Sequence, residues 1–459
     1  MLGGVRVVAA GAALITDAVP EADLLRLDWR PPGSGDPDAA RDLMTVTEPE
    51  VDAANARAMA LVHAVRPQLL DVRPASDVVP GLVDHGLLHA GPPIAWSRMC
   101  GPMQGALIGA TLFEGWAPDE SAARALLGSG RITLSPCHDH ATVGPMAGVV
   151  SPSMPVLVVG DGERRAFATL NEGLGKVLRF GAFDAEVLGR LAWLREVLGP
   201  VLSQALETGG PVDVTTLVAQ ALSMGDEGHN RNLASSSLLA RRLAPELARL
   251  DDGAAALSFL AANDHFALNI SMAAAKLSMD AAADVAHSSL VTVMCRNGVE
   301  FGIRTAGTGA QWFTAPVGPA TGLYFSGFGP EHANPDLGDS SITETLGLGG
   351  FAMAAAPAIT RFVGGTVADA IATTRSMRRI TITEHPVYQL PGLGFVGTPS
   401  GIDARKVVET GVLPVINTGI AHLEAGVGQI GAGTVTAPAE VFSAAIAALA
   451  ARERAEASR

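Results

Sequence analysis

Groups that could bind a metal are concentrated in one short stretch, where Cys137, His138, Asp139 and His140 occupy consecutive positions. In an extended segment His138 and His140 would face the same way, as two ligands of one metal must. Cys137 and Asp139 would then face the opposite way, so further ligands would have to come from elsewhere. A loop histidine that bonds to the backbone is the simpler interpretation, and we predict no metal site.

Basic side chains beside glycines form a second candidate site. The stretch NEGLGKVLRFGA places Lys176 and Arg179 three residues apart, directly after Gly173 and Gly175. Residues at this spacing share one face of a helix, and amides bared by glycine at a helix start bind anions. The stretch therefore suggests a phosphate or oxyanion site, with a solvated basic face as the alternative.

Two further stretches combine histidine with carboxylates. The sequence MGDEGHNRN joins acid and base groups to Arg231, which could bind a carboxylate, although Asp226 and Asn232 could instead cap helices. The sequence NTGIAHLEAGVGQIGAG places His422 and Glu424 before a run of glycines. Such a run resembles a phosphate-cradling loop, but close packing also requires glycine. A third stretch, ANPDLGDSSITET, could bind a cation or cap a helix, and capping is favoured.

The composition limits the possible partners. The chain has 459 residues, 48 % of them hydrophobic, and a formal net charge of -14. This balance predicts a globular protein and argues against nucleic acid or an anionic membrane surface as the main partner. Long uncharged runs are broken by Gly and Pro, so we expect no transmembrane helix. Three cysteines without a CxxC pair fit a reducing cytoplasm.

The helices and strands that must position these groups are predicted from the spacing of apolar residues and from the Gly and Pro residues that end the apolar runs. Short apolar runs ending in Gly and Pro predict a mixed α/β (α+β), multi-domain fold, and the first apolar run, Val7 to Ile15, is interpreted as a buried strand. We predict an N-terminal α/β segment at 1–60, an α/β domain at 61–183, a helical domain at 184–286, and a C-terminal α/β domain at 287–459 that packs with 61–183. Local signals are a helix over Val51 to Val65, N-caps at Asp184 and Asp213, and a hairpin at Asn297-Gly298.

The order of the motifs is similar to that of the YlbE/AllG-like family, over about Asp52 to Ala447. The resemblance lies in LLHAGPP, GPMQGALIGATLFEGWA, PCH…VGPM, LNEG…GKVLRFGA, MGDE…RN, TRFVG and NTGIAH…EAGVGQIGAGTV. Members are encoded beside FdrA-type proteins that resemble acyl-CoA synthetases. The family motif does not require histidine at position 140, which weakens the metal interpretation further.

The resemblance implies a subunit of a carbamoyltransferase similar to oxamate carbamoyltransferase. That enzyme moves a carbamoyl group between oxalurate and phosphate, giving oxamate and carbamoyl phosphate, in allantoin (purine) catabolism. The implied partners are a small anionic substrate, phosphate, an FdrA-like subunit and further copies of the chain, without nucleic acid or membrane. The scheme requires no redox or nucleotide cofactor, and we expect none.

This chemistry suggests a role for each candidate residue. Attack of phosphate on a ureido carbonyl needs two anions held together, a donor to the developing oxyanion and an acid for the departing nitrogen. We predict proton transfer by His138 or His422, oriented by Glu172 or Glu424. Substrate and anion binding is predicted for Asn171, Lys176, Arg179, Arg231, Asn417 and Gln429. Two alternatives stay open: a noncatalytic subunit that completes an FdrA-like active site, and a metal-dependent amidohydrolase of ureido compounds that uses His138 and His140.

Overall fold

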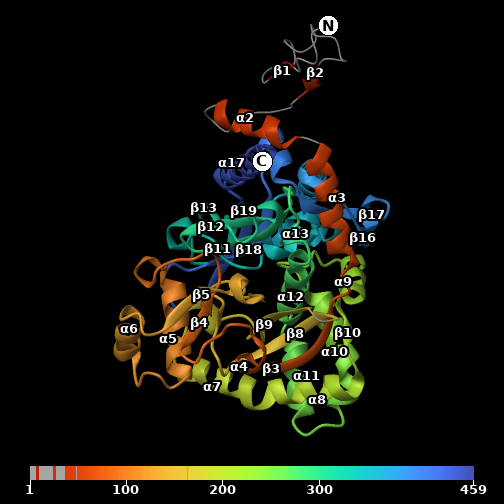
Figure 1. Ribbon diagram of the computed structural model, residues 1–459. Helices are drawn as coiled ribbons and strands as arrows, with labels where there is room; N and C mark the ends of the chain where they lie inside the picture. Colours follow the sequence, from red (N-terminus) through yellow and green to blue (C-terminus); the bar gives the residue numbers. More distant parts are fainter. Residues whose placement is uncertain (1–6, 10–23, 27–36, 48, 163, 459) are drawn as a thin grey trace, which may run out of the picture.

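The computed structural model describes residues 7–9, 24–26, 37–47, 49–162 and 164–458. Figure 1 shows helices α2, α3 and α17 at one end of the molecule and α5 to α8, α10 and α11 around the other, with sheets between them. Helix α12 runs through the centre and links the two halves.

Besides the two-stranded β1-β2 sheet, strands from the first half of the chain form two larger sheets in the described residues. One sheet has the order β10-β3-β8-β9-β6 and comprises Val212–Asp213, Gln68–Pro74, Pro155–Asp161, Arg164–Thr169 and Thr142–Val143. The other has the order β5-β4-β7 and comprises Thr133–Pro136, Gly86–His89 and Val149–Val150. Strand β8 is almost entirely buried, which explains its uninterrupted apolar sequence PVLVVG.

The later strands form antiparallel sheets. The order β13-β12-β11-β15 comprises Phe313–Pro316, Glu300–Thr305, Val291–Asn297 and Leu337–Gly338. The order β14-β19-β18 comprises Thr321–Tyr324, Gln429–Thr436 and Val415–Ala421, and β16 (Thr381–Leu390) pairs with β17 (Val396–Ile402). Near the N-terminus, β1 (Val7–Ala9) and β2 (Leu24–Arg26) pair in parallel.

The α-helices cover and separate these sheets. In the first half they are α2 (Pro37–Val46), α3 (Pro49–Ala64), α4 (Ala75–Val78), α5 (Gly101–Phe113), α6 (Glu120–Gly128), α7 (Ala185–Trp193) and α8 (Gly199–Gly209). The second half adds α9 (Val214–Ser223), α10 (Leu233–Leu247), α11 (Gly253–Ala262), α12 (Phe266–Asp280), α13 (Ile342–Leu346), α14 (Thr360–Val363), α15 (Val367–Met377), α16 (Ala404–Thr410) and α17 (Ala439–Ala457).

Helix α12 is the centre of the core. Every residue from Phe266 to Met279 is buried, because the helix packs on β8 and β9 on one side and on α13 and β11 on another. A helix buried on all faces is mostly apolar, and the side-chain amide and ammonium groups of α12 have partners: Asn269 donates to the carbonyl of Thr169 at 2.7 Å, and Lys276 donates to Asp280 at 2.7 Å. The helical stretch therefore shares one hydrophobic core with the segments before and after it. The domain boundaries inferred from composition stay a prediction.

Several local predictions are confirmed. The mixed α/β fold is present, helix α3 covers the predicted segment, and the side chains of Asp184 and Asp213 accept backbone N–H groups as N-caps of α7 and α9. Strands β11 and β12 form the hairpin at Asn297-Gly298, where Gly298 takes the left-handed φ of 82° that the tight turn requires. Of the strand expected over Val7 to Ile15, Val7–Ala9 is observed and the remainder lies outside the described residues.

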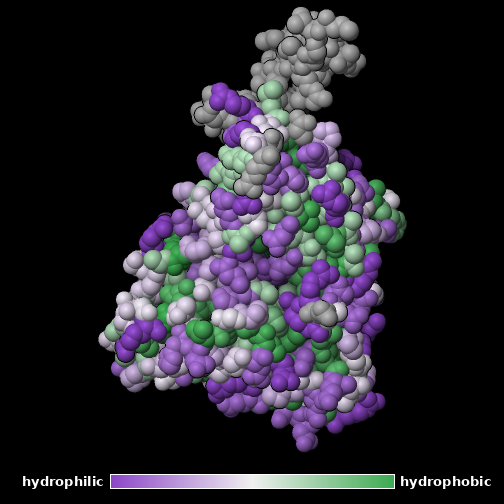
Figure 2. Space-filling view, viewed as in Figure 1, coloured by the Kyte–Doolittle hydropathy of each residue, from purple (hydrophilic) through white to green (hydrophobic). Residues whose placement is uncertain are grey.

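The surface is more hydrophilic than the composition of the whole chain, as expected when apolar side chains are buried. Figure 2 shows hydrophilic side chains over most of the visible face, with smaller apolar areas between them. Within the described part of the chain, no helix has both the length and the apolar character needed to cross a membrane.

Candidate functional site

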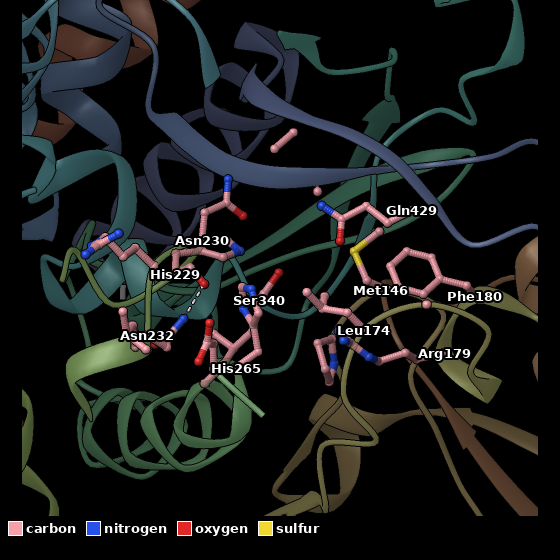
Figure 3. Close-up of a pocket in the computed structure, with 18 of the residues that line it drawn as sticks. Met146, Leu174, Arg179, Phe180, His229, Asn230, Asn232, His265, Ser340 and Gln429 are labelled. Carbon is pink, nitrogen blue, oxygen red and sulfur yellow. Dashed lines mark hydrogen bonds between the residues drawn. The ribbon is translucent and has the colours of Figure 1, made fainter. Parts of the chain in front are cut away.

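A pocket of about 530 Å³ opens where loops from both halves of the chain meet strands β14, β18 and β19. Figure 3 shows Met146, Leu174, Arg179 and Phe180 on one side and Asn230, Asn232 and His265 on the other, with Ser340 between them. The basic residues that line it are Arg179, Arg231, Arg361, His229 and His265. Among the described lining residues Asp264 is the one carboxylate, so the pocket is basic in a chain of net charge -14.

The loop between α9 and α10 is folded around the carboxylate of Glu227. This buried group accepts the backbone N–H of His229 at 2.5 Å and of Asn230 at 2.7 Å, and the side-chain amide of Asn417 at 3.1 Å. Asp226 accepts the N–H of Ser235 at 2.8 Å and so caps the start of α10. The acidic residues of MGDEGHNRN thus position the loop that carries His229 and Arg231 into the pocket.

His229 and Glu344 form a buried pair in the pocket wall. Nδ1 of His229 lies 2.8 Å and 3.0 Å from the two carboxylate oxygens of Glu344, and both side chains are almost fully buried. A carboxylate can only accept a hydrogen bond, so Nδ1 carries the proton and Nε2 is the nitrogen left for a ligand. This arrangement suits an acid or base whose tautomer is fixed by a second residue.

Glu344 is itself held from several directions. It accepts the hydroxyl of Thr343 at 3.0 Å and the backbone N–H groups of Gly350 at 3.1 Å and Asn417 at 3.3 Å. A Cβ at Gly349 would lie 1.9 Å from Oε1 of Glu344, so glycine is required for this close approach. Helix α13, β18 and the segment after α13 therefore fix the carboxylate that orients His229.

Arg179 enters the pocket from the opposite side. Glu172 accepts the backbone N–H of Leu178 at 2.8 Å and of Arg179 at 3.3 Å, and the guanidinium donates to the carbonyl of Gly173 at 2.5 Å. Burial lowers the pKa of Arg179 to about 10, so it stays charged at neutral pH. Within the described residues its Nε has no hydrogen-bond partner, which leaves a donor for an anion.

Other basic groups complete the pocket. Arg231 donates to the carbonyl of Gly225 at 2.9 Å, and Arg361 comes from the exposed face of α14. Burial, together with the charges of Arg179 and His229, lowers the pKa of His265 to about 4, so this ring is neutral at neutral pH. A site of this kind binds anions through its arginines and presents neutral hydrogen-bonding groups beside them.

The structure brings several of the sequence-predicted residues to the pocket or its walls. Arg179, Arg231 and Gln429 line it directly. Glu172 and Asn417 lie behind, bonded to the backbone that carries Arg179 and to Glu227. Asn171 donates to Asn269 at 2.9 Å and fastens the 171–173 loop to α12.

Other predicted residues lie elsewhere. Lys176 is exposed and paired with the N-cap carboxylate of Asp184. The ring of His422 stacks on His332 with centroids 5.7 Å apart, and its Nδ1 accepts the backbone N–H of Glu424 at 2.9 Å. Glu424 is exposed, so its carboxylate does not orient that ring.

His138 and His140 do not share a face. Residues Cys137–His140 form a 3-10 turn (η3) instead of the extended segment considered above, and Nδ1 of His140 lies 2.8 Å from the carbonyl oxygen of Pro80 near the surface. His138 points inward, where burial lowers its pKa well below the usual value. The pair required by a metal-dependent amidohydrolase at His138 and His140 is therefore not assembled.

The predicted site residues did not include His229, Glu344, Arg361 or His265, although His229 belongs to a stretch that could supply an acid or base; all four lie at the pocket or in its wall. The motifs MGDEGHNRN, ANPDLGDSSITET, TRFVG and NDHFALN contain them. The partnership of His229 with Glu344 joins positions 115 residues apart, and spacing alone does not reveal it.

Comparison with known proteins places this chain in a family. A family model described as oxamate carbamoyltransferase subunit AllG matches residues 132–340. The oxamate carbamoyltransferase subunit AllG of Escherichia coli (strain K12) is 52 % identical over 412 residues, covering 87 % of this chain and 98 % of that protein. The uncharacterized protein YahG of the same organism is 45 % identical over 452 residues, covering 96 % of each.

A solved structure has the same fold. The crystal structure of a conserved protein of unknown function from Enterococcus faecalis V583 matches with a TM-score of 0.86 and 48 % sequence identity, covering 88 % of this chain and 98 % of that chain. The chain thus matches nearly the whole length of each relative and shares the fold of the solved structure. The chain therefore belongs to the family of the oxamate carbamoyltransferase subunit AllG.

Proposed function

We propose that the chain is the carbamoyl-transferring subunit of a phosphate-dependent carbamoyltransferase that acts on a ureido acid such as oxalurate. The observation that carries the proposal is a basic pocket in which His229, oriented by Glu344, is combined with Arg179, Arg231 and Arg361. The family relationship supports the same reaction class, because one relative bears the name oxamate carbamoyltransferase subunit.

The arginines account for the two anions of the reaction. Phosphate and the carboxylate of a ureido acid repel each other, so holding both requires several positive charges in one site. Arg179 lies on the side of Phe180, whereas Arg231 and His229 come from the α9–α10 loop. We assign phosphate and carboxylate to these two sides, with the ureido carbonyl between them.

The transfer step then needs one proton to move. A phosphate oxygen attacks the ureido carbonyl, a carbon–oxygen bond forms, and the bond between that carbon and the oxamate nitrogen breaks. Nε2 of His229 takes the proton that hydrogen phosphate loses on attack and delivers it to the departing nitrogen, and Glu344 faces the charge that the ring carries between these two transfers. The products are oxamate and carbamoyl phosphate; in the reverse direction His229 accepts the proton.

Exposed apolar residues at the mouth of the pocket favour action within an assembly. Leu174, Leu233, Leu323 and Phe325 line the pocket and are 41–57 % exposed. Apolar groups gathered around a charged site are typical of a surface that another subunit covers. We propose an FdrA-like subunit there, in a cytoplasmic complex that also contains further copies of the chain.

The test is phosphate-dependent formation of carbamoyl phosphate from oxalurate by the full-length chain, alone and with its FdrA-like neighbour. We expect product with the neighbour present, and loss of product when phosphate is omitted. Formation of ammonia and carbon dioxide without a phosphate requirement would indicate hydrolysis instead. Absence of every product, with both proteins folded and associated, would remove the proposal.

A further inference from the structure

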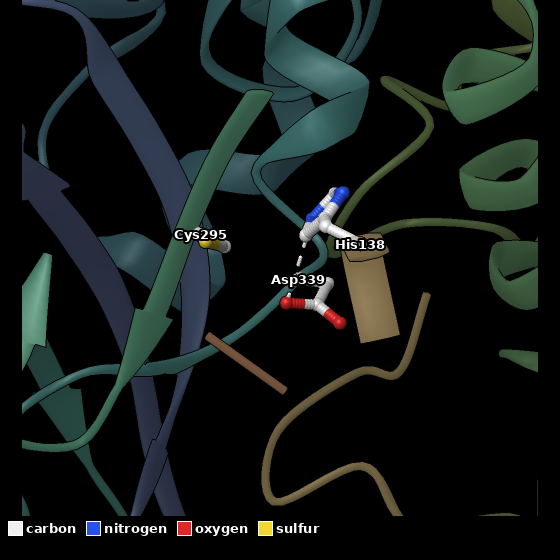
Figure 4. Close-up of side chains that lie close together, drawn as sticks. All are labelled: His138, Cys295 and Asp339. Atoms are coloured by element: carbon white, nitrogen blue, oxygen red, sulfur yellow. Dashed lines mark ion pairs between the residues drawn. The ribbon is translucent and has the colours of Figure 1, made fainter. Parts of the chain in front are cut away.

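A second cluster, separate from the lining of the pocket, joins three different kinds of metal ligand. Nitrogen of His138, Sγ of Cys295 and a carboxylate oxygen of Asp339 all lie within 4.8 Å of one another, and all three residues are buried. Figure 4 shows the side chains of His138, from the turn η3, and Asp339 close together, with Cys295 of β11 nearby. They come from segments that are far apart in the sequence.

His138 has surroundings that are unusual for a buried histidine. Its side chain is fully buried, and within the described residues neither ring nitrogen has a hydrogen-bond partner. Buried polar groups are nearly always paired, and an orphaned imidazole costs free energy. Asp339 is 3.5 Å from Nε2, beyond the usual length of a hydrogen bond. An ion that accepts the lone pair of Nε2 would satisfy that nitrogen, and Nδ1 would keep its N–H.

The distances suit a metal better than a direct contact. Ligands at about 2.0–2.3 Å from a tetrahedral zinc lie about 3.3–3.8 Å from each other. The 3.5 Å between Nε2 of His138 and Oδ1 of Asp339 falls in this range, and Sγ of Cys295 lies within 4.8 Å of both residues. Thiolate, imidazole and carboxylate together match a borderline-soft divalent ion.

The surrounding charges are compatible with a cation. The Cys295 thiol donates to the carbonyl of Gly302 at 3.7 Å, and metal binding would displace this proton, so that a thiolate and a carboxylate supply two negative charges to the bound ion. The nearby cations each have a carboxylate of their own. Lys276 pairs with Asp280 at 2.7 Å, Arg296 with Asp336 at 2.7 Å, and Arg304 with Asp139. Their positive charges at the cluster are therefore partly offset by these carboxylates.

We propose that His138, Cys295 and Asp339 bind one zinc ion that fastens the wall of the pocket. Asp339 accepts the backbone N–H of Gly91 at 2.7 Å and of Gly144 at 2.9 Å. Its neighbour Ser340 lines the pocket, as does Pro145 after Gly144. A metal here ties η3 and β11 to the segment around Asp339, and its role is structural. The proposal is independent of the transfer reaction.

The test measures metal and not activity. Full-length protein purified without chelator or metal-affinity resin is analysed for zinc, then stripped and titrated with cobalt(II). We expect about one zinc per chain, a cobalt–thiolate charge-transfer band, and a higher melting temperature with zinc. In Cys295→Ser the band is lost and affinity falls by more than about 100-fold, beyond the typical effect of changing a residue that only supports a ligand.

Matched variants separate the cluster from other thiols and histidines. Cys100→Ser and His140→Gln change the same residue types outside the cluster, and both should keep the metal and the band. His138→Asn is the second variant if Cys295→Ser does not fold. Substoichiometric metal with no cobalt–thiolate band in the unmodified protein overturns the proposal, as does undiminished binding by folded Cys295→Ser or His138→Asn.

Discussion

Glu344 holds His229 by Nδ1, with 2.8 Å to one carboxylate oxygen and 3.0 Å to the other. The pair is buried in the wall of a pocket that also contains Arg179 and Arg231. An imidazole fixed in this way exchanges protons through Nε2 alone. Its acid–base role can therefore be separated experimentally from anion binding by the arginines.

Replacing His229 tests proton transfer directly. His229→Asn removes Nε2, and we expect kcat to fall by about 10²–10⁴-fold. Glu344→Gln keeps one acceptor oxygen but removes the charge that faces the ring, so a smaller loss is expected. The measurement is steady-state formation of carbamoyl phosphate by the complete assembly.

The matched control for this prediction is His332→Asn, because His332 is a partly exposed histidine that stacks on His422 outside the pocket lining. It should retain kcat. Equal losses in the two variants, or full activity of folded His229→Asn, would contradict the assignment.

Arg361 offers a test of anion binding with little risk to the fold. Its side chain is exposed on α14 and lines the pocket. Loss of one charge-assisted contact, about 1.4 kcal/mol, raises the KM for the anion about tenfold in Arg361→Gln and leaves kcat nearly unchanged. Added salt screens the charge of Arg361, so it should reduce the difference in KM between Arg361→Gln and the unmodified protein. Arg375→Gln on α15 is the control, and an equal rise in KM there would indicate a nonspecific charge effect.

Sequence patterns predicted local structure well, because helix caps and tight turns depend on neighbouring residues. Asp184 and Asp213 cap helices, and Asn297-Gly298 forms a hairpin, as their spacing indicates. Arg179 reaches the pocket from a glycine-rich loop for a similar reason, since Glu172 is close in sequence. The mixed α/β class followed from the alternation of such signals.

The rest of the site could not be predicted from the sequence, because its residues are brought together by tertiary contacts between distant segments. His422 has the spacing of a functional histidine, yet tertiary packing stacks it on His332 and places it edge-to-face with Phe328. Lys176 is turned toward Asp184 instead of the pocket. The partnership of His229 with Glu344 exists only because α13 packs beside the α9–α10 loop.

The exposed apolar mouth of the pocket predicts a subunit contact. Phe325 is 51 % exposed, so Phe325→Ser should leave the melting temperature almost unchanged while raising the Kd for the FdrA-like subunit by about tenfold or more. Analytical ultracentrifugation of the mixed proteins measures this. Phe395→Ser, at an exposed phenylalanine after β16, is the matched control. Unchanged association of Phe325→Ser would place the contact elsewhere.

His385 of β16 gives the protein an acid-sensitive core. Its Nδ1 accepts the backbone N–H of Val387 at 3.1 Å and of Tyr388 at 2.9 Å, so protonation breaks both bonds. Burial, with the charges of His63 and Arg66, lowers its pKa from 6.5 to about 3. Between these two pKa values the unfolded chain binds more protons than the folded chain, so the free energy of unfolding falls as pH falls, by about 2 kcal/mol from pH 6.5 to pH 5.

His385→Asn tests this, because it keeps an acceptor near the Nδ1 position without titrating. Urea unfolding between pH 6.5 and pH 5 should show a loss of unfolding free energy that is smaller by about 2 kcal/mol than in the unmodified protein. The partly exposed His140→Asn should retain the original dependence, and an unchanged slope in His385→Asn would show that other groups control acid unfolding.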